Sequence, residues 1–290
     1  MLGEVLTAIV TPFTREGTVD IGRFRALARY LVDRGSDGVV VAGTTGECPT
    51  LTDEERAALI AAALEEIGDR ATVIAGTGTY STAHSVHLTK AAHALGVHGV
   101  LVVTPYYNKP PQEGLYRHFA TLAAATPLPC ILYNIPGRTG SNILPETIAN
   151  LAKLPTIVAV KEATGSMDQA SAIAALCDIT LLSGDDSLTL PLMSIGGRGV
   201  VSVVGNVVPR DMKALVAAWD AGKRDEAIRL HYKLFTLCRD MLGISTNPIP
   251  VKTALRMLGR DTGELRLPLC TMDASQEAKL AQTLKAYGLM

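Results

Sequence analysis

The 290-residue sequence lacks paired cysteines, long apolar runs and clusters of positive charge. Its five cysteines (48, 130, 177, 238 and 270) are scattered without a CxxC pair or metal-ligand spacing, so reduced thiols and a cytoplasmic location are expected. No apolar run is long enough to cross a bilayer, and the first residues do not resemble a secretory leader, so no membrane association is expected. The 27 basic and 28 acidic residues are interspersed, which argues against binding to nucleic acid.

The composition instead favours a globular protein that acts on small molecules. Hydrophobic residues make up 48% of the chain and charged residues 19%, so the chain can bury a large core. A length of 290 residues is common for an α/β barrel that forms one unit.

Eight short apolar runs, rich in β-branched residues, recur along the first three-quarters of the chain. Each is apolar throughout rather than alternating, which is typical of parallel strands covered on both faces. The runs are VLTAIV (5–10), GVVVAG (38–43), TVIAGT (72–77), GVLVVT (99–104), CILYN (130–134), IVAVK (157–161), ITLLSG (179–184) and VVSVV (200–204).

Helical segments separate these runs, and some carry clear start signals. Thr52 and Glu55 have the spacing of a capping box, and Pro145 and Pro248 suit the first turns of helices. Eight strand–helix units predict a (β/α)8 TIM barrel. An open doubly wound sheet is the alternative, although its G-x-G-x-x-G signature is absent.

No further strand-like apolar run follows the eighth one, and the rest of the chain has helical patterns. We therefore expect residues 1–223 to form the barrel that carries the active site. Residues 224–290 are expected to form a C-terminal helical appendage.

In such a barrel the active site lies where the strands end, so the residues there indicate the chemistry. This ring of residues is rich in hydroxyl groups and holds one lysine, but it contains no histidine, no cysteine and no carboxylate cluster. A metal site is therefore not expected. Asp185 and Asp186 resemble half of a magnesium site, but without a phosphate-binding loop we expect them to cap the following helix. Cys48 lies near the ring but lacks an identifiable activating partner.

Lys161 is the lysine that directly ends an apolar strand run. Partial desolvation there favours the neutral amine, which can attack a carbonyl carbon to form a Schiff base. The alternative is an ion pair with Glu162 or with a more distant carboxylate. Adjacent strand residues point to opposite faces, which disfavours the pair with Glu162.

Two further residues have suitable chemistry near Lys161. Tyr133 ends the preceding strand run, and its phenol can relay protons to and from a carbinolamine or enamine. Arg138 follows in the loop PGRTG, where its planar guanidinium suits a carboxylate. Packing alone also explains a tyrosine at a strand end, and a surface arginine can simply hold a loop.

Several motifs of the chain closely resemble those of the dihydrodipicolinate synthase (4-hydroxy-tetrahydrodipicolinate synthase) family of pyruvate-dependent class I aldolases. The resemblance covers essentially the whole chain. The motifs are GTTGE (43–47), TPYYNKP (104–110), YNIPGRTG (133–140), KEATG (161–165), SGDD (183–186) and NPIPVK (247–252).

This resemblance implies condensation of pyruvate with L-aspartate 4-semialdehyde through an imine on Lys161, without a metal or organic cofactor. It implies proton relay by Tyr133 with Thr44 and with Tyr107 of a neighbouring subunit, within a homotetramer built from tight dimers. It also implies a set of substrate-binding residues. These are Thr45, Gly184 and Val201 for pyruvate, and Arg138 for the carboxylate of the semialdehyde.

Other functions remain as alternatives. Sialate lyases and sugar-acid aldolases of the same family keep the lysine and the tyrosine, whereas the pair Thr44-Thr45 and Arg138 favour the synthase. A catalytically silent barrel used for binding is a hypothesis of another class.

The resemblance is weaker at the site where lysine binds and inhibits some family members. Lysine-sensitive bacterial forms typically have an asparagine and a glutamate where this chain has Tyr80 and His84. Asp53 and Arg56 replace their histidines. Weak or absent inhibition by lysine is therefore expected.

Overall fold

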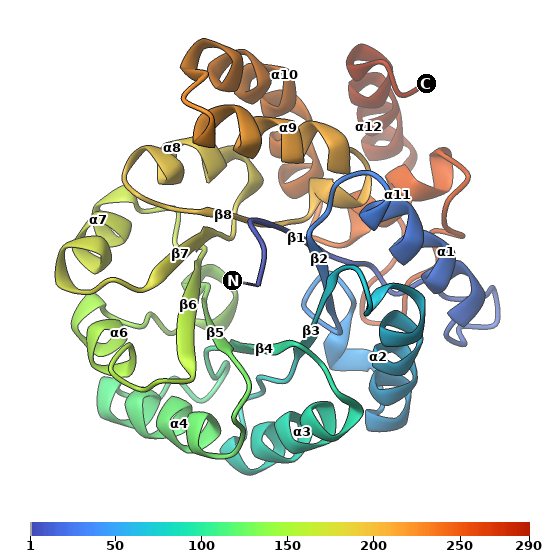
Figure 1. Ribbon diagram of the computed structural model, residues 1–290. Helices are drawn as coiled ribbons and strands as arrows, with labels where there is room; N and C mark the ends of the chain where they lie inside the picture. The colour runs from blue at the N-terminus through green and yellow to red at the C-terminus, as the bar shows by residue number, and fades with distance from the viewer. Residues whose placement is uncertain (1) are drawn as a thin grey trace.

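The computed structural model describes residues 2–290, in which eight parallel strands close into a barrel surrounded by helices (Figure 1). Each strand pairs with its neighbours in sequence order, and β1 closes the barrel against β8. All eight predicted strand runs are confirmed, and the open-sheet alternative is wrong. The strands are β1 (Val5–Ala8), β2 (Gly38–Val41), β3 (Thr72–Gly76), β4 (Gly99–Val103), β5 (Cys130–Asn134), β6 (Ile157–Glu162), β7 (Thr180–Ser183) and β8 (Gly199–Ser202).

The connecting helices form the outer ring. They are α1 (Ile21–Val32), α2 (Asp53–Ile67), α3 (Thr82–Leu95), α4 (Gln112–Ala124), α6 (Pro145–Leu151), α7 (Met167–Leu176), α8 (Thr189–Ser194) and α9 (Pro209–Asp220). The chain also forms the one-turn helix α5 (Pro136–Thr139) and three 3-10 turns, η1 (Cys48–Thr50), η2 (Asp186–Leu188) and η3 (Val204–Asn206).

The predicted helix starts are present. Thr52 and Glu55 form a capping box at the start of α2, where each side chain bonds the other residue's backbone amide. Pro145 is the first residue of α6, and Pro248 immediately precedes α11 (Ile249–Met257). Local sequence chemistry therefore determines these boundaries.

Two hydrophobic layers result from the alternation of side chains along the strands. The larger one lies between the strands and the outer helices. The smaller one fills the barrel and takes alternate strand residues, such as Ile131 and Tyr133 of β5 and Ala159 of β6. The filled interior makes the barrel a packed core, and the residues beyond the strand ends are left to form a site.

The C-terminal part of the chain is helical, as expected. It contains α10 (Arg224–Gly243), α11 (Ile249–Met257) and α12 (Ala274–Tyr287). In Figure 1, α10 and α12 lie outside the ring, and α10 packs against both α9 and α12. The boundary proposed at residue 223 falls between α9 and α10, and the division into two regions stays a prediction.

Across residues 2–290, no helix is both long and apolar enough to span a bilayer.

Candidate active site

Lys161 lies inside the barrel mouth with only 4% of its surface exposed. Its side chain lies on the same face of the chain as those of Ala159 in β6 and Ala163 just beyond it, which both belong to the barrel interior. Glu162 points the other way, where its carboxylate accepts hydrogen bonds from the Asn134 side chain and the Thr164 amide. The expected divergence of Lys161 and Glu162 is therefore confirmed.

Tyr133 is the direct neighbour of Lys161 on the adjacent strand. The two residues are paired in the register of β5 and β6, and the Lys161 Nζ lies 4.0 Å from the centroid of the Tyr133 ring. Thr104 fixes the Tyr133 carbonyl with both its amide and its hydroxyl group, each at 2.9 Å. This buried phenol is thus held beside the amine.

Asp185 follows β7 and lies within electrostatic reach of Lys161. Burial raises the pKa of the Asp185 carboxyl, and the positive charge of Lys161 partly opposes that shift. The amine therefore shares its buried surroundings with one carboxyl group that the sequence did not identify as its partner.

The expectation that Asp185 and Asp186 cap the following helix is wrong. The Asp185 side chain makes no capping bond at η2. The Asp186 carboxylate instead accepts hydrogen bonds from the Ser202 hydroxyl and from the amides of Val203 and Val204, at 3.0 and 3.1 Å. Asp186, which follows β7, thereby satisfies two buried amides between the end of β8 and the start of η3.

Thr44 shares a small cavity with Tyr133. The cavity has a volume of about 20 Å³ and is also lined by Gly43, Cys48 and Gly76. Such a space is large enough for about one water molecule. Burial raises the pKa of the Cys48 thiol, which disfavours the reactive thiolate.

Thr45 and Arg138 are brought together by a residue that the sequence did not single out. The Asn247 side chain donates from Nδ2 to the Thr45 hydroxyl oxygen at 3.0 Å. The Asn247 carbonyl accepts a hydrogen bond from Arg138, also at 3.0 Å. Asn247 belongs to the motif NPIPVK, which contributed to the family resemblance. The motif has no periodicity or charge pattern from which the contacts of Asn247 could be predicted.

Gly184 and Val201 lie close to the same mouth. The Gly184 amide donates to the Glu162 carbonyl at 2.7 Å, and a Cβ atom on Gly184 would lie 2.5 Å from that of Ala163. A side chain at position 184 would therefore clash with the strand end that carries Lys161. Val201 is fully buried in the interior layer that also contains Tyr133.

Tyr107 is not brought into this group, because its side chain is 92% exposed. Its φ of +73° is unfavourable for a residue with a bulky side chain, and the same loop places Lys109 at +45°. The Lys109 stem lies so close to Gly140 that a Cβ atom there would be 2.8 Å from its Cε. The Tyr107 loop thus packs against the loop that carries Arg138.

Four of the histidines lie on α3 or just after it. His84 and His87 are exposed on α3 and contact the carboxylate of Asp53 on α2, at 3.2 and 3.6 Å. His98 precedes β4 and accepts a bond from the Val73 amide.

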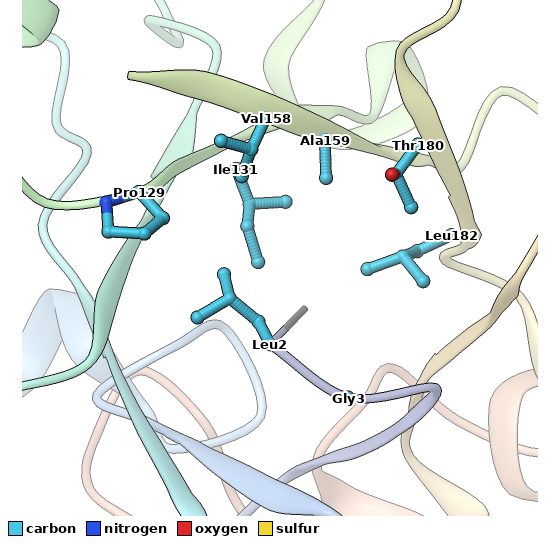
Figure 2. Close-up of a pocket in the computed structure, with 8 residues that line it drawn as sticks. All are labelled: Leu2, Gly3, Pro129, Ile131, Val158, Ala159, Thr180 and Leu182. Atoms are coloured by element: carbon cyan, nitrogen blue, oxygen red, sulfur yellow. The ribbon is translucent and has the colours of Figure 1, made fainter. Parts of the chain in front are cut away.

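A separate cavity of about 270 Å³ opens at the other end of the barrel, where the strands begin. Figure 2 shows its mostly apolar wall. The lining residues are Leu2, Gly3, Pro129, Ile131, Val158, Ala159, Thr180 and Leu182. Thr180 supplies the only hydroxyl side chain among them, and none has a side chain that can act as a general base to activate it, so we place the chemistry at the end that holds Lys161.

The chain is similar to known proteins along nearly its whole length. A sequence profile of the Dihydrodipicolinate synthetase family matches residues 1–287. A 4-hydroxy-tetrahydrodipicolinate synthase from Moorella thermoacetica is 54% identical over 290 residues, covering 99% of each chain. One from Heliobacterium modesticaldum is 51% identical, covering 99% of this chain and 96% of its own.

Solved structures show the same similarity. A dihydrodipicolinate synthase from Cyanidioschyzon merolae with lysine bound has a TM-score of 0.97 at 45% identity, covering 100% of this chain and 99% of its own. The enzyme from Aquifex aeolicus has a TM-score of 0.96 at 46% identity, covering 99% and 98%.

Proposed function

Because the chain belongs to the dihydrodipicolinate synthetase family, we propose that it condenses pyruvate with L-aspartate 4-semialdehyde through a Schiff base on Lys161. The product is 4-hydroxy-tetrahydrodipicolinate, an intermediate of lysine and diaminopimelate biosynthesis. The observation that carries the role of Lys161 is its buried amine inside the barrel mouth, directly beside the Tyr133 phenol.

The first half of the reaction makes a carbon nucleophile. The neutral Lys161 amine adds to the ketone carbon of pyruvate, and loss of water gives an imine. The protonated imine withdraws electrons, so the methyl group loses a proton and becomes an enamine. Tyr133 is positioned to move these protons, with Thr44 across the small cavity as its neighbour in the relay.

The second half joins the two substrates. The enamine carbon attacks the aldehyde carbon of the semialdehyde, and the aldehyde oxygen takes up a proton. The amine of the same substrate then displaces Lys161 from the imine carbon, which closes the ring and restores the free lysine. The enzyme needs no external electron acceptor, since the imine itself accepts the electron pair.

The substrate carboxylates are assigned to two sides of the mouth. Thr45, with the backbone of Gly184 and Val201, binds the carboxylate side of pyruvate, and the guanidinium of Arg138 binds the carboxylate of the semialdehyde. Thr45 and Arg138 both bond Asn247, which supports their acting on the two substrates within one mouth.

We also propose that the enzyme is a cytoplasmic homotetramer built from two tight dimers. An exposed Tyr107 on a loop with unfavourable backbone angles supports a role in the mouth of a partner subunit. The free state of all five cysteines is compatible with a reducing compartment. Sedimentation analysis of the wild type and of Tyr107→Ala tests the assembly.

The decisive experiment is reduction with borohydride in the presence of pyruvate, followed by peptide mass mapping. The expected result is one modified residue, Lys161, with no modification when pyruvate is omitted. Modification of another lysine, or of none, would contradict the proposal. Parallel assays with L-aspartate 4-semialdehyde and N-acetylmannosamine with pyruvate then distinguish the synthase from a sialate lyase.

A further inference from the structure

Asn247 connects the two residues that are assigned to the substrate carboxylates. Its side chain is bonded to Thr45 and its backbone carbonyl to Arg138, and only 7% of its surface is exposed. Within residues 2–290 no group donates to its Oδ1 atom, although that atom is buried. A buried amide with one unsatisfied atom is costly, which suggests a role beyond packing.

A buried ion pair holds this segment against the barrel. Lys252, one turn into α11, contacts Glu47 of the GTTGE loop at 2.7 Å and the Thr11 carbonyl at 2.8 Å. Glu47 is only two residues from Thr45, so the pair fixes both partners of the Asn247–Thr45 hydrogen bond. Asn247 lies two residues before α11 and is therefore anchored next to a rigid element, as a positioning group requires.

The direction of the Asn247–Thr45 bond determines what Thr45 can do. An amide nitrogen can only donate, so the Thr45 oxygen must accept, and the hydroxyl proton is left to point elsewhere. A carboxylate needs such a donor, because its oxygens only accept. We propose that Asn247 is a positioning residue that turns the Thr45 hydroxyl proton toward the carboxylate of pyruvate.

The inference rests on the proposed function, and it assigns the side chain and the backbone of Asn247 to different substrates. The Asn247 side chain affects pyruvate through Thr45, whereas its backbone carbonyl affects the semialdehyde through Arg138. A side-chain substitution removes only the first of these contacts. Pyruvate binding should therefore change while the KM for the semialdehyde stays the same.

The test uses Asn247→Asp and Asn247→Ala in the full chain, with Asn150→Asp, at an exposed position of α6, as the control. A carboxylate at position 247 accepts the Thr45 proton and repels pyruvate. Asn247→Asp should therefore raise the pyruvate concentration for half-maximal borohydride trapping about 10- to 100-fold. Asn247→Ala leaves the Thr45 proton undirected and should raise it about threefold. The KM for the semialdehyde should stay within about twofold in both variants.

A double-variant cycle tests whether Asn247 acts through Thr45. In a Thr45→Val background, Asn247→Ala should add no further loss of pyruvate binding. An additional loss there, or unchanged trapping in both single variants, would overturn the inference. It would also be overturned if both KM values rose together with a lower melting temperature, since that pattern indicates a purely structural role. If Asn247→Asp fails to fold, Asn247→Ala and the cycle decide.

The outcome for the wild type separates this inference from the proposed function. Absence of trapping at Lys161 in the wild type would reject the Schiff base itself. Normal wild-type trapping with unaffected Asn247 variants would reject the positioning role alone.

Discussion

Lys252 and Glu47 form an ion pair at 2.7 Å with both side chains almost completely buried. Burial lowers the pKa of Lys252, and the negative charge of Glu47 opposes that shift, so each charge depends on the other. The pair joins helix α11 to the GTTGE loop, which are distant in sequence.

Breaking this pair should destabilise the fold strongly. Lys252→Met leaves the Glu47 carboxylate buried without its cation, and the free energy of unfolding should fall by about 3–5 kcal/mol. Denaturant unfolding measures this change. The matched control is Lys233→Met, which removes a half-exposed pair with Asp211 and should cost at most about 1 kcal/mol.

The double variant Lys252→Met with Glu47→Gln should recover most of the loss, because no unpaired charge then remains. A small effect of Lys252→Met, similar to that of Lys233→Met, would contradict the importance of the pair.

Removal of the Tyr133 hydroxyl should slow the reaction without preventing imine formation. Tyr133→Phe keeps the ring beside the Lys161 Nζ atom but removes the proton relay, so kcat should fall about 10²- to 10⁴-fold. Borohydride should still trap pyruvate on Lys161 at saturating pyruvate. Tyr116→Phe on α4 is the control, and a kcat for Tyr133→Phe within twofold of the wild type would reject the relay.

The sequence predicted the features that depend on local patterns. The apolar strand runs located all eight strands, and strand alternation placed Lys161 and Glu162 on opposite faces. The parallel register of adjacent strands then brought Tyr133 beside Lys161.

The sequence could not predict contacts that depend on the closed barrel. Asn247 meets Thr45 across 202 positions, and no local period encodes such a distance. The prediction that Asp185 and Asp186 cap the following helix was wrong for the same reason. Asp186 resembles a helix cap in sequence, but in the folded chain its carboxylate bonds the amides that follow β8, which are distant in sequence.

Weak or absent inhibition by lysine is expected of this chain. Lysine-sensitive relatives typically have a glutamate that can bind the ammonium group of lysine. This chain has His84 at that position, and His84 already contacts Asp53. The Arg56 guanidinium donates a hydrogen bond to the carbonyl of Cys48. Initial rates measured over a wide range of lysine concentrations check this prediction, and steep inhibition at low concentrations would contradict it. The double variant Tyr80→Asn with His84→Glu should gain sensitivity.

The stability of the fold should depend on pH through His118 of α4. Its ring is 4% exposed, Nδ1 contacts the Thr82 hydroxyl at 2.9 Å, and the buried Nε2 has no partner within residues 2–290. Burial lowers the pKa of His118 from 6.5 to about 4, because the charged ring is not solvated.

The sign of the effect follows from the order of protonation. The unfolded chain takes up the His118 proton near pH 6.5, whereas the folded chain does so only near pH 4. The stabilisation by neutral His118 is therefore complete above pH 6.5 and is lost as the pH falls toward 4. A shift of this size corresponds to about 3 kcal/mol.

His118→Gln should remove this contribution, because glutamine can bond Thr82 but does not titrate. Denaturant unfolding at several pH values between 7 and about 4 should show a smaller loss of stability for His118→Gln than for the wild type. His93→Gln, an exposed change on α3, should leave the wild-type pH dependence intact. Equal pH dependence in the wild type and His118→Gln would mean that the ring is protonated in the folded state at the same pH as in the unfolded chain.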